Sequence, residues 1–488
     1  MMTRKPRIIA GVCFAVAAAT LLNAQQPRRT ADDPRVKAAL ALLDVWLDAE
    51  RAYQQVPGIS AEVVVDQQAL WKSAYGYADL ASKRPAAVDT IYSICSISKL
   101  FTSVAAMQLR DAGKLRLDDP VAKHLPWFTI ARSAPDGPEI TIEGLFTHAS
   151  GLPREADAPY WTDANFPTHD QIVAGLRQQQ TLYPAEKYFQ YSNLGMSLLG
   201  EIVAAESGMP YGDYAQRNVL QPLGLAHTTP EMPSSEQGKH LATGYSGITR
   251  TGDRRAAPFF LARGIAPAAG YASTVEDLGR FASWQFRLLE RGGTEVLNAN
   301  TLREMYRVHF VDPDFETTWG LGFTVWRSDG KTFVGHGGSC PGFQTELLIR
   351  PEDKIATVFM ANAQGLNSRQ WAQRMFDIVA PAVRAASKEP DKAKKPDPDL
   401  ERYLGSYQGM PYFSGEVAVV RWEDGIALLN LPTMDPLRAL TKLKQTGPNR
   451  FRRIRSDESL GEEIVFEVGA DGRVTRFTHT NNYFPRIR

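Results

Sequence analysis

Apolar positions near the start of the chain recur first at a helical and then at a strand-like spacing. Between Asp32 and Tyr53 they return every three or four residues, which predicts an amphipathic helix. Residues 59–75 then alternate or run apolar in short stretches, as the strands of a hairpin do. The fold is therefore expected to begin with a helix followed by antiparallel strands.

Helical patterns dominate between about residues 91 and 290, and strand patterns return after them. The later strand-like segments are residues 320–327, 332–336 and 344–362, and a helical pattern over residues 368–383 follows. Strands at both ends with helices between them predict an α+β fold, in which one antiparallel sheet is assembled from both ends beside an all-helical lobe. A cleft between two such lobes is a natural active site.

Residues 386–399 separate this region from the end of the chain. They include three prolines and no large apolar residue, which predicts an extended linker. Beyond them, Asp-Gly pairs at 424–425 and 471–472 lie between alternating runs and indicate hairpin turns. We expect a large domain over residues 30–385 and a small β-barrel or sandwich over residues 400–488.

Residues 1–24 differ from the rest of the chain. Basic side chains at positions 4, 5 and 7 precede an apolar run over residues 8–22. This layout is typical of a secretory signal peptide, here with cleavage near Ala24. The run has about 15 residues, whereas a membrane-spanning helix needs roughly 20. The chain is therefore expected to be exported, to the periplasm or the medium, with no stable membrane span after signal removal.

The charge balance excludes one class of partner. The 488 residues include 55 basic and 54 acidic side chains, a net charge of +1. No field of one sign is available to attract nucleic acid, so nucleic acid is not an expected partner.

A serine and a lysine three residues apart form the first candidate catalytic group. Ser96 and Lys99 lie at the start of a helical pattern that Gly113 ends. This spacing places a hydroxyl and an amine on the same side of a helix. A buried amine has a lowered pKa and can accept the serine proton. Alternatively, Ser96 is a helix N-cap and Lys99 a solvated surface residue.

The triplet Tyr191-Ser192-Asn193 forms the second group, just before a helical pattern that ends at Gly208. A phenol near Lys99 would have a lowered pKa and could act as a general base, and Asn193 could bind a substrate amide or carbonyl. The alternative is a Ser or Asn helix cap beside a packed aromatic ring.

The third group is the glycine-rich segment 335–339, which contains His336, Gly338 and Ser339 within a strand-like pattern. Glycines inside a strand often mark a close approach of a ligand to the backbone. An edge strand of small residues can offer its amide hydrogens, so the N–H of Ser339 could join that of Ser96 in holding an oxyanion. The alternative is a glycine-rich turn with an idle histidine.

Together these segments resemble the three motifs of the serine β-lactamase and penicillin-binding superfamily, Ser-x-x-Lys, Tyr-x-Asn and His-x-Gly. The chain is similar to the branch with class C β-lactamases, D-aminopeptidases, D-Ala-D-Ala carboxypeptidases and family VIII esterases. Supporting stretches are residues 145–152, 270–278 and 341–343. The likeness covers about residues 50–385, and the end of the chain resembles the lipocalin-like β-domain that often follows such hydrolases.

The resemblance implies acyl transfer to water through an acyl-enzyme. Ser96 would be acylated, and Lys99 and Tyr191 would act as base and acid. Backbone amides of Ser96 and Ser339 would form the oxyanion hole. The residues implied to bind the substrate or its oxyanion are Asn193, His336, Gly338 and Ser339.

Two departures from the family pattern change the expected substrate and site. His336 replaces a lysine, and a histidine is mostly neutral at pH 7. Carboxylate-bearing β-lactams are therefore less favoured than carboxylic esters or D-amino-acid peptides. A true β-lactamase and a penicillin-binding sensor that is acylated without turnover are the alternatives. Residues 184–186 read Pro-Ala-Glu where the family usually has Pro-Gly, so the family does not define the loop before Tyr191.

Two cysteines flank the first and third motifs. Cys95 directly precedes Ser96, and Cys340 lies four residues beyond His336. Some class A carbapenemases have a similar arrangement, with a disulfide between the residue before the serine and a cysteine at the same offset in the third motif. The resemblance therefore implies a Cys95–Cys340 disulfide, and the alternative is a pair of buried, reduced thiols.

No metal and no cofactor are expected. The histidines show no His-x-x-x-His spacing, and neither clustered cysteines nor a glycine-rich phosphate loop is present. His148 either supports the packing of its loop or takes part in catalysis. The expected partner is a small-molecule or peptide substrate, and the sequence leaves the oligomeric state open.

Overall fold

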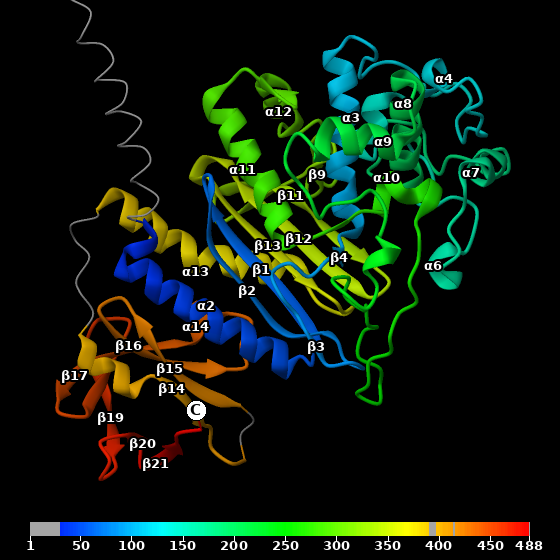
Figure 1. Cartoon of the computed structure of the whole chain (residues 1–488). Helices are drawn as coiled ribbons and strands as arrows, with labels where there is room; N and C mark the ends of the chain where they lie inside the picture. The colour runs from blue at the N-terminus through cyan, green and yellow to red at the C-terminus, as the bar shows by residue number, and fades with distance from the viewer. Residues whose placement is uncertain (1–29, 390–396, 413–414, 488) are drawn as a thin grey trace, which may run out of the picture. The chain divides into compact units, whose positions relative to one another are not determined.

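The computed structural model describes residues 30–389, 397–412 and 415–487, so the expected signal segment lies outside the described residues. The chain divides into two units (Figure 1). Residues 51–376 form the first, and the described residues within 1–50 and 377–488 form the second. No helix among the described residues combines the length and apolar character needed to cross a membrane.

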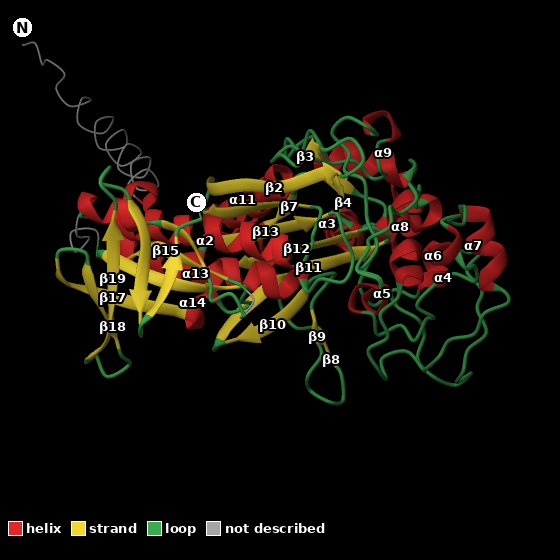
Figure 2. Ribbon diagram, turned by 90° about the horizontal axis from the view of Figure 1, so that it is seen from below, coloured by secondary structure: helices red, strands yellow, loops and turns green. Residues whose placement is uncertain are grey.

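A nine-stranded antiparallel sheet supports the first unit, in the order β3-β2-β1-β13-β12-β11-β10-β9-β8. Figure 2 shows β13, β12, β11 and β10 following one another across it. Ile59 of β1 lies opposite Ala361 of β13, which confirms that distant parts of the chain build one sheet. The strands are β1 (Gly58–Val65), β2 (Gln68–Asp79), β3 (Arg84–Pro85), β8 (Phe310–Val311), β9 (Thr318–Trp319), β10 (Thr324–Ser328), β11 (Lys331–Cys340), β12 (Phe343–Arg350) and β13 (Ile355–Ala361).

Alternation along β13 gives the sheet two apolar faces. Val358 and Met360 face the main core, towards which helix α11 (Val275–Arg291) packs. Phe359 points the other way, and its ring stacks on that of Trp371 at 5.0 Å. Trp371 belongs to the first half of helix α13 (Ser368–Lys388), so helices cover both faces of the central strands.

The expected helical lobe lies beside the sheet, where Figure 1 groups α3, α8, α9 and α10. Ser192 caps α8 by accepting a hydrogen bond from the N–H of Gly195, and Gly208 ends the helix at a φ of 71°. The remaining elements of this unit are β4 (Tyr92–Ser93), α3 (Ser98–Asp111), α4 (Val121–His124), α5 (Ile142–Thr147), α6 (Tyr160–Asp163), α7 (His169–Leu176), α8 (Asn193–Ser207), α9 (Tyr211–Ala215), α10 (Ala266–Ala269), β5 (Ala272–Ser273), β6 (Thr294–Glu295), β7 (Leu297–Asn298) and α12 (Ala299–Met305).

An eight-stranded antiparallel sheet in sequential order forms most of the second unit. A bridge between Tyr407 and Arg486 joins its first and last strands, so the sheet is a nearly closed barrel. The expected hairpins connect β15 to β16 and β19 to β20. The elements are β14 (Gly405–Gln408), β15 (Glu416–Trp422), β16 (Gly425–Leu431), α14 (Pro436–Ala439), β17 (Leu440–Gly447), β18 (Arg450–Ile454), β19 (Leu460–Val468), β20 (Val474–His479) and β21 (Asn482–Pro485).

The unit boundaries differ from the expected domain boundaries. Most of helix α2 (Pro34–Tyr53) belongs with the barrel, because the indole of Trp46 donates to the Thr433 carbonyl at 2.8 Å. Helix α13 continues to Lys388, and a 3-10 helix begins at Pro398. The expected linker is therefore shorter than residues 386–399, because alanines near its start extend the helix. Residues 390–396 lie outside the described part.

Candidate active site

Ser96 lies in a short 3-10 turn, Cys95–Ile97, directly before helix α3. Cys95 has a φ of 51°, which is a left-handed backbone conformation that residues other than glycine rarely adopt. Such conformations are retained where the surrounding structure fixes them, often at functional sites. The N-cap of α3 is Ile97, so Ser96 is not the N-cap of this helix. Ser96 instead faces a cleft.

A disulfide joins Cys95 to Cys340, with their Cα atoms 5.6 Å apart, which confirms the expected bond. It connects the residue before Ser96 to the end of β11. Near this bond, the backbone of Gly338 packs directly against residue Ile94, because a Cβ atom on Gly338 would be only 2.2 Å from the Ile94 carbonyl oxygen. The first and third motifs are thus joined by a covalent bond and by a contact that only glycine permits.

Lys99 is fully buried, which excludes the alternative of a solvated surface residue. Burial lowers the pKa of its amine well below the usual value, and the nearby Glu155 offsets part of this effect. The amine Nζ hydrogen-bonds to the carbonyl oxygen of Ala268 (2.7 Å), Asn193 Oδ1 (2.8 Å) and Ser96 Oγ (3.1 Å). A neutral amine has two N–H groups, which can donate their hydrogen bonds to Asn193 Oδ1 and the Ala268 carbonyl oxygen. Its lone pair is then left for the hydroxyl of Ser96.

Asn193 holds Lys99 in this orientation. Its Nδ2 donates to both carboxylate oxygens of Glu155, at 2.9 and 3.0 Å, which turns Oδ1 towards Lys99. Asn193 is 2% exposed and is not among the residues that line the cleft. Its expected contact with substrate stays a prediction, whereas its contact with the amine is present. Glu155 belongs to none of the three motifs, although it lies only three residues past the family-like stretch 145–152.

Tyr191 lies against both members of the first motif. Lys99 Nζ is 4.8 Å from the centre of its ring, and its phenol hydrogen-bonds with the Ser96 side chain. Burial raises the pKa of Tyr191, and the Ser96 hydrogen bond offsets this only in part. The expectation of a lowered pKa was therefore wrong, because burial away from water outweighs both the Ser96 hydrogen bond and the positive charge of Arg154. The phenol is neutral and can donate a proton.

His336 is 4% exposed and packs beside Tyr191 and Trp319, with ring centres 6.2 and 5.6 Å away. Its Nδ1 lies 2.6 Å from the Gly337 carbonyl oxygen, which requires a proton on that nitrogen. Burial, together with a smaller effect of Lys99, lowers the pKa of His336 to about 3. The imidazole is therefore neutral, as the sequence analysis expected of a histidine at this position.

His148 supports the loop before Tyr191. It ends helix α5 in a left-handed conformation, with a φ of 60°. Its Nδ1 accepts a hydrogen bond from the Ser192 N–H at 3.2 Å, and its ring lies 4.3 Å from that of Tyr191. Burial lowers the pKa of His148 well below its usual value. These contacts favour the packing interpretation over a catalytic one.

A cleft of about 390 Å³ opens over Ser96. Strand β10 pairs with β11 only as far as Gly335, so beyond that residue β11 is paired with β12 on one side. Two arginines of the lining, Arg154 and Arg369, belong to none of the three motifs and were not expected from the sequence. The lining residues are Ser96, Arg154, Tyr191, Trp319, Thr324, His336, Gly337, Gly338, Ser339, Gln344, Ser368 and Arg369.

The cleft has a positive lining, because these residues include the two arginines and no acidic side chain. The guanidinium of Arg154 lies 4.9 Å from the centre of the Tyr191 ring and pairs with Glu155 at 3.1 Å. Arg369 pairs with the buried Glu346 at 3.2 Å. Among the described residues no group of three or more potential ligands is arranged to hold a metal ion.

The sequence matches the profile of the family "Beta-lactamase" over residues 43–380. It is 25% identical over 426 residues to "Beta-lactamase-like protein 2" of Dictyostelium discoideum, covering 82% of this chain and 76% of that protein. It is 27% identical over 322 residues to "Protein flp" of Staphylococcus aureus strain MW2, covering 66% of this chain and 62% of that protein. The match thus spans less than two thirds of the staphylococcal protein.

Among solved structures, the chain is similar to the octameric penicillin-binding protein homologue from Pyrococcus abyssi. The TM-score is 0.61, the sequence identity is 24%, and the match covers 91% of this chain and 98% of that one. At this identity the likeness shows a shared fold.

Proposed function

Because this chain belongs to the Beta-lactamase family, we propose that it is a serine hydrolase that works through an acyl-enzyme. One observation carries the proposal. The buried amine of Lys99 is held by two carbonyl-type oxygens, Asn193 Oδ1 and the Ala268 carbonyl, and lies 3.1 Å from Ser96 Oγ. A lysine in this state is a general base for the serine hydroxyl.

Acylation begins when Ser96 Oγ attacks the substrate carbonyl carbon and its proton moves to Lys99 Nζ. The negative charge that develops on the carbonyl oxygen is held by the backbone N–H groups of Ser96 and Ser339. The bond to the leaving group then breaks, and Tyr191 gives its phenolic proton to that group. Lys99 returns a proton to the phenolate, so the amine and phenol regain their starting states.

Deacylation repeats these steps with water as the nucleophile. Lys99 accepts a proton from the attacking water, and Ser96 Oγ, as the leaving group, receives a proton from Tyr191. Asn193 acts as a positioning residue in both halves, because its side-chain oxygen fixes one N–H of the amine.

The lining of the cleft favours a substrate with a carboxylate. His336 is neutral, but Arg154 and Arg369 supply two positive charges that the sequence analysis did not include. The side chain of Arg154 is 58% exposed and that of Arg369 is 40% exposed, so both can reach a ligand. We therefore favour an ester or a D-amino-acid peptide amide that carries an acidic group. The same two arginines favour β-lactam hydrolysis as the second candidate.

We also propose that the protein is exported. Disulfides persist in oxidising compartments outside the cytosol, and Cys95 and Cys340 are bonded. The class C-like branch and the likeness of the barrel to a lipocalin-like β-domain are likewise proposals.

Parallel assays test the activity and rank the substrates. A p-nitrophenyl ester, a D-alanyl anilide and a chromogenic cephalosporin would each be tested with the wild type and with Ser96→Ala. We expect turnover of at least one of them and its loss in the variant. Intact-mass measurement during turnover should show no lasting adduct. Activity that survives Ser96→Ala would overturn the proposal, and a stable adduct without turnover would identify a penicillin-binding sensor.

A further inference from the structure

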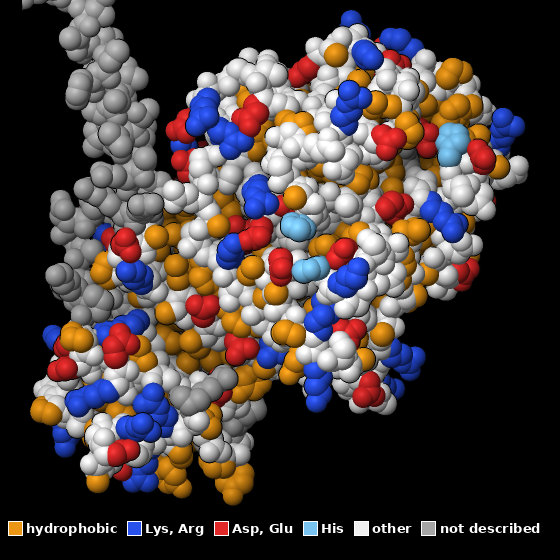
Figure 3. Space-filling model, in the orientation of Figure 1, with side chains coloured by type: hydrophobic (Ala, Val, Ile, Leu, Met, Phe, Trp, Pro, Cys, Tyr) orange, Lys and Arg blue, Asp and Glu red, His pale blue; other side chains and the backbone are white. Residues whose placement is uncertain are grey.

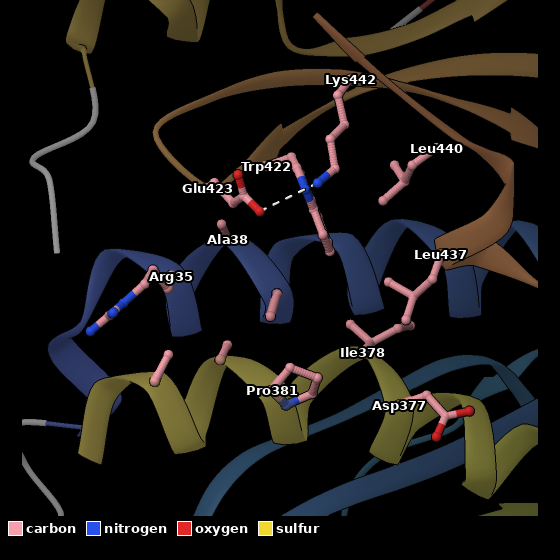
Figure 4. Close-up of a pocket in the computed structure, with 13 residues that line it drawn as sticks. Arg35, Ala38, Asp377, Ile378, Pro381, Trp422, Glu423, Leu437, Leu440 and Lys442 are labelled. Atoms are coloured by element: carbon pink, nitrogen blue, oxygen red, sulfur yellow. Dashed lines mark hydrogen bonds and ion pairs between the residues drawn. The ribbon is translucent and has the colours of Figure 1, made fainter. Parts of the chain in front are cut away.

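A second cavity lies in the barrel-containing unit and shares no residue with the cleft over Ser96. Its volume is about 450 Å³, within the range of small-molecule sites. Figure 4 shows it between α2, the second half of α13 and the strands β15 to β17. It is lined by Arg35, Ala38, Ala39, Asp377, Ile378, Pro381, Ala382, Ala385, Trp422, Glu423, Leu437, Leu440 and Lys442.

The walls of this cavity are mainly apolar. Four alanines, Ala38 and Ala39 on α2 with Ala382 and Ala385 on α13, leave room between the two helices. The Trp422 side chain points from the barrel towards α2 (Figure 4). The barrel interior is filled by its own aromatic rings, including Tyr403 and Phe466, so this space lies outside the barrel wall. An alkyl chain fits walls of this kind.

One end of the cavity offers hydrogen-bond donors. Lys442 pairs with Glu423 at 3.5 Å, and their side chains are 48% and 62% exposed. A long ion pair between exposed side chains stabilises little, so another anion can replace Glu423. The Trp422 Nε1–H is buried and has no hydrogen-bond partner among the described residues. Lys442 and Trp422 can therefore both serve one acidic group.

The surroundings of Lys442 favour an anion over a neutral or cationic ligand. Residues 440–454, which form β17 and β18, contain five basic and no acidic side chains. Figure 3 shows several Lys and Arg side chains over the barrel, with Asp and Glu side chains among them. The other lining cation, Arg35, is already held by Asp33 at 2.7 Å and by the Glu389 carbonyl. The acidic group is thus expected at Lys442.

We propose that this cavity binds a single-chain amphiphile with a carboxylate head, such as a medium-chain fatty acid. The alkyl chain lies between α2 and α13 against the four alanines. The carboxylate accepts hydrogen bonds from Lys442 Nζ and, after displacing Glu423, from Trp422 Nε1.

Binding of octanoate, decanoate and dodecanoate to the full chain tests the proposal, measured by calorimetry below micellar concentrations. We expect one saturable site, with affinity rising roughly three- to fourfold for each added methylene. 1-Decanol, which has no charge, should bind more weakly than decanoate. Binding that appears only at micellar concentrations, or equal affinity for the alcohol and the acid, would overturn the proposal.

Variants locate the site. Lys442→Gln should weaken decanoate binding by about tenfold or more, as expected for the loss of a charged hydrogen bond, and should leave 1-decanol binding nearly unchanged. Lys444→Gln is the matched control, because Lys444 is an exposed neighbour on the same strand that does not line the cavity. Equal losses in the two variants would indicate a diffuse charge effect and refute the site.

Ala382→Leu fills the cavity and should weaken the acid and the alcohol alike. Its melting temperature reports whether the variant is folded. Decanoate affinity that stays at the wild-type level in both Lys442→Gln and a folded Ala382→Leu would place the ligand elsewhere.

Discussion

Lys99 Nζ and Ser96 Oγ lie 3.1 Å apart at the buried end of the cleft. Because Asn193 Oδ1 and the Ala268 carbonyl also bind the Lys99 amine, Ser96 and Lys99 are oriented towards each other before any substrate binds. The charges that surround the amine therefore control the pH at which the site works.

Two charge-neutralising variants should shift the pH dependence in opposite directions. Glu155 raises the pKa of Lys99 and Arg154 lowers it. The base must be neutral, so kcat/KM is lost as the pH falls through the pKa of Lys99. Glu155→Gln should move this acid limb to lower pH, and Arg154→Gln should move it to higher pH. The measurement is the pH profile of kcat/KM. Arg369→Gln is the control, and shifts of the same sign in both variants would contradict Lys99 as the base.

Arg369 should determine the preference for acidic substrates. Loss of its guanidinium in Arg369→Gln removes a charged hydrogen-bond donor from the cleft, which is worth a factor of about 10 to 100. We expect kcat/KM to fall by this factor for a substrate with a free carboxylate and to change little for its methyl ester. Arg327→Gln, at an exposed residue outside the cleft lining, should leave the ratio of kcat/KM between the free carboxylate and its methyl ester unchanged. An unchanged ratio in Arg369→Gln would exclude this arginine from substrate recognition.

The disulfide should contribute to stability and to activity. It closes a loop with a sequence separation of 245 residues, and removal of a native disulfide typically costs about 2–5 kcal/mol. The double variant Cys95→Ser, Cys340→Ser should therefore lose about this much free energy of unfolding in urea. Its kcat should also fall, because the left-handed residue before Ser96 is no longer tied to β11. A variant with wild-type stability and kcat would show that the bond is dispensable.

Glu62 should make the stability depend on pH. It is 3% exposed on β1, and burial raises its pKa to about 8. The folded state therefore favours the protonated form, and the Glu62 contribution to stability is lost as the pH rises from about 4.5 to about 8, by at most roughly 1.4 kcal/mol per pH unit. Glu62→Gln should remove this dependence and be the more stable protein at pH 8. Urea unfolding at pH 5, 7 and 8 tests this, with the exposed Glu290→Gln as control. Equal pH dependence in wild type and Glu62→Gln would contradict it.

The sequence predicted those helices and hairpins whose start and end signals lie in neighbouring residues. Helix α8 begins after a capping serine and ends at Gly208, and both signals are written in consecutive residues. The three motifs were found for the same reason. The alternatives of a solvated Lys99 and of reduced thiols fell only when the structure showed Lys99 fully buried and Cys95 bonded to Cys340. For the second motif the alternative is partly met, because Ser192 does cap α8 and the Tyr191 ring is packed against that of His148.

Features that depend on distant residues could not be predicted in this way. Glu155 approaches Asn193 from another loop, and Ala268 contributes only a backbone oxygen, which no side-chain motif reveals. The direction of the Tyr191 pKa shift depends on burial, and the triplet alone does not contain that information. Closure of the barrel rests on the bridge between Tyr407 and Arg486, which follows from the register of all eight strands.

The pairing of Ile59 with Ala361 has a consequence for biosynthesis. During translation, β1 leaves the ribosome long before its neighbour β13 has been made. The backbone N–H and C=O groups along one edge of this strongly apolar strand are therefore unpaired until β13 is synthesised. Contacts between such distant segments slow folding and leave nascent chains open to aggregation. Ser96 and Lys99 are synthesised early, but the wall of the cleft that faces them is made only with β11.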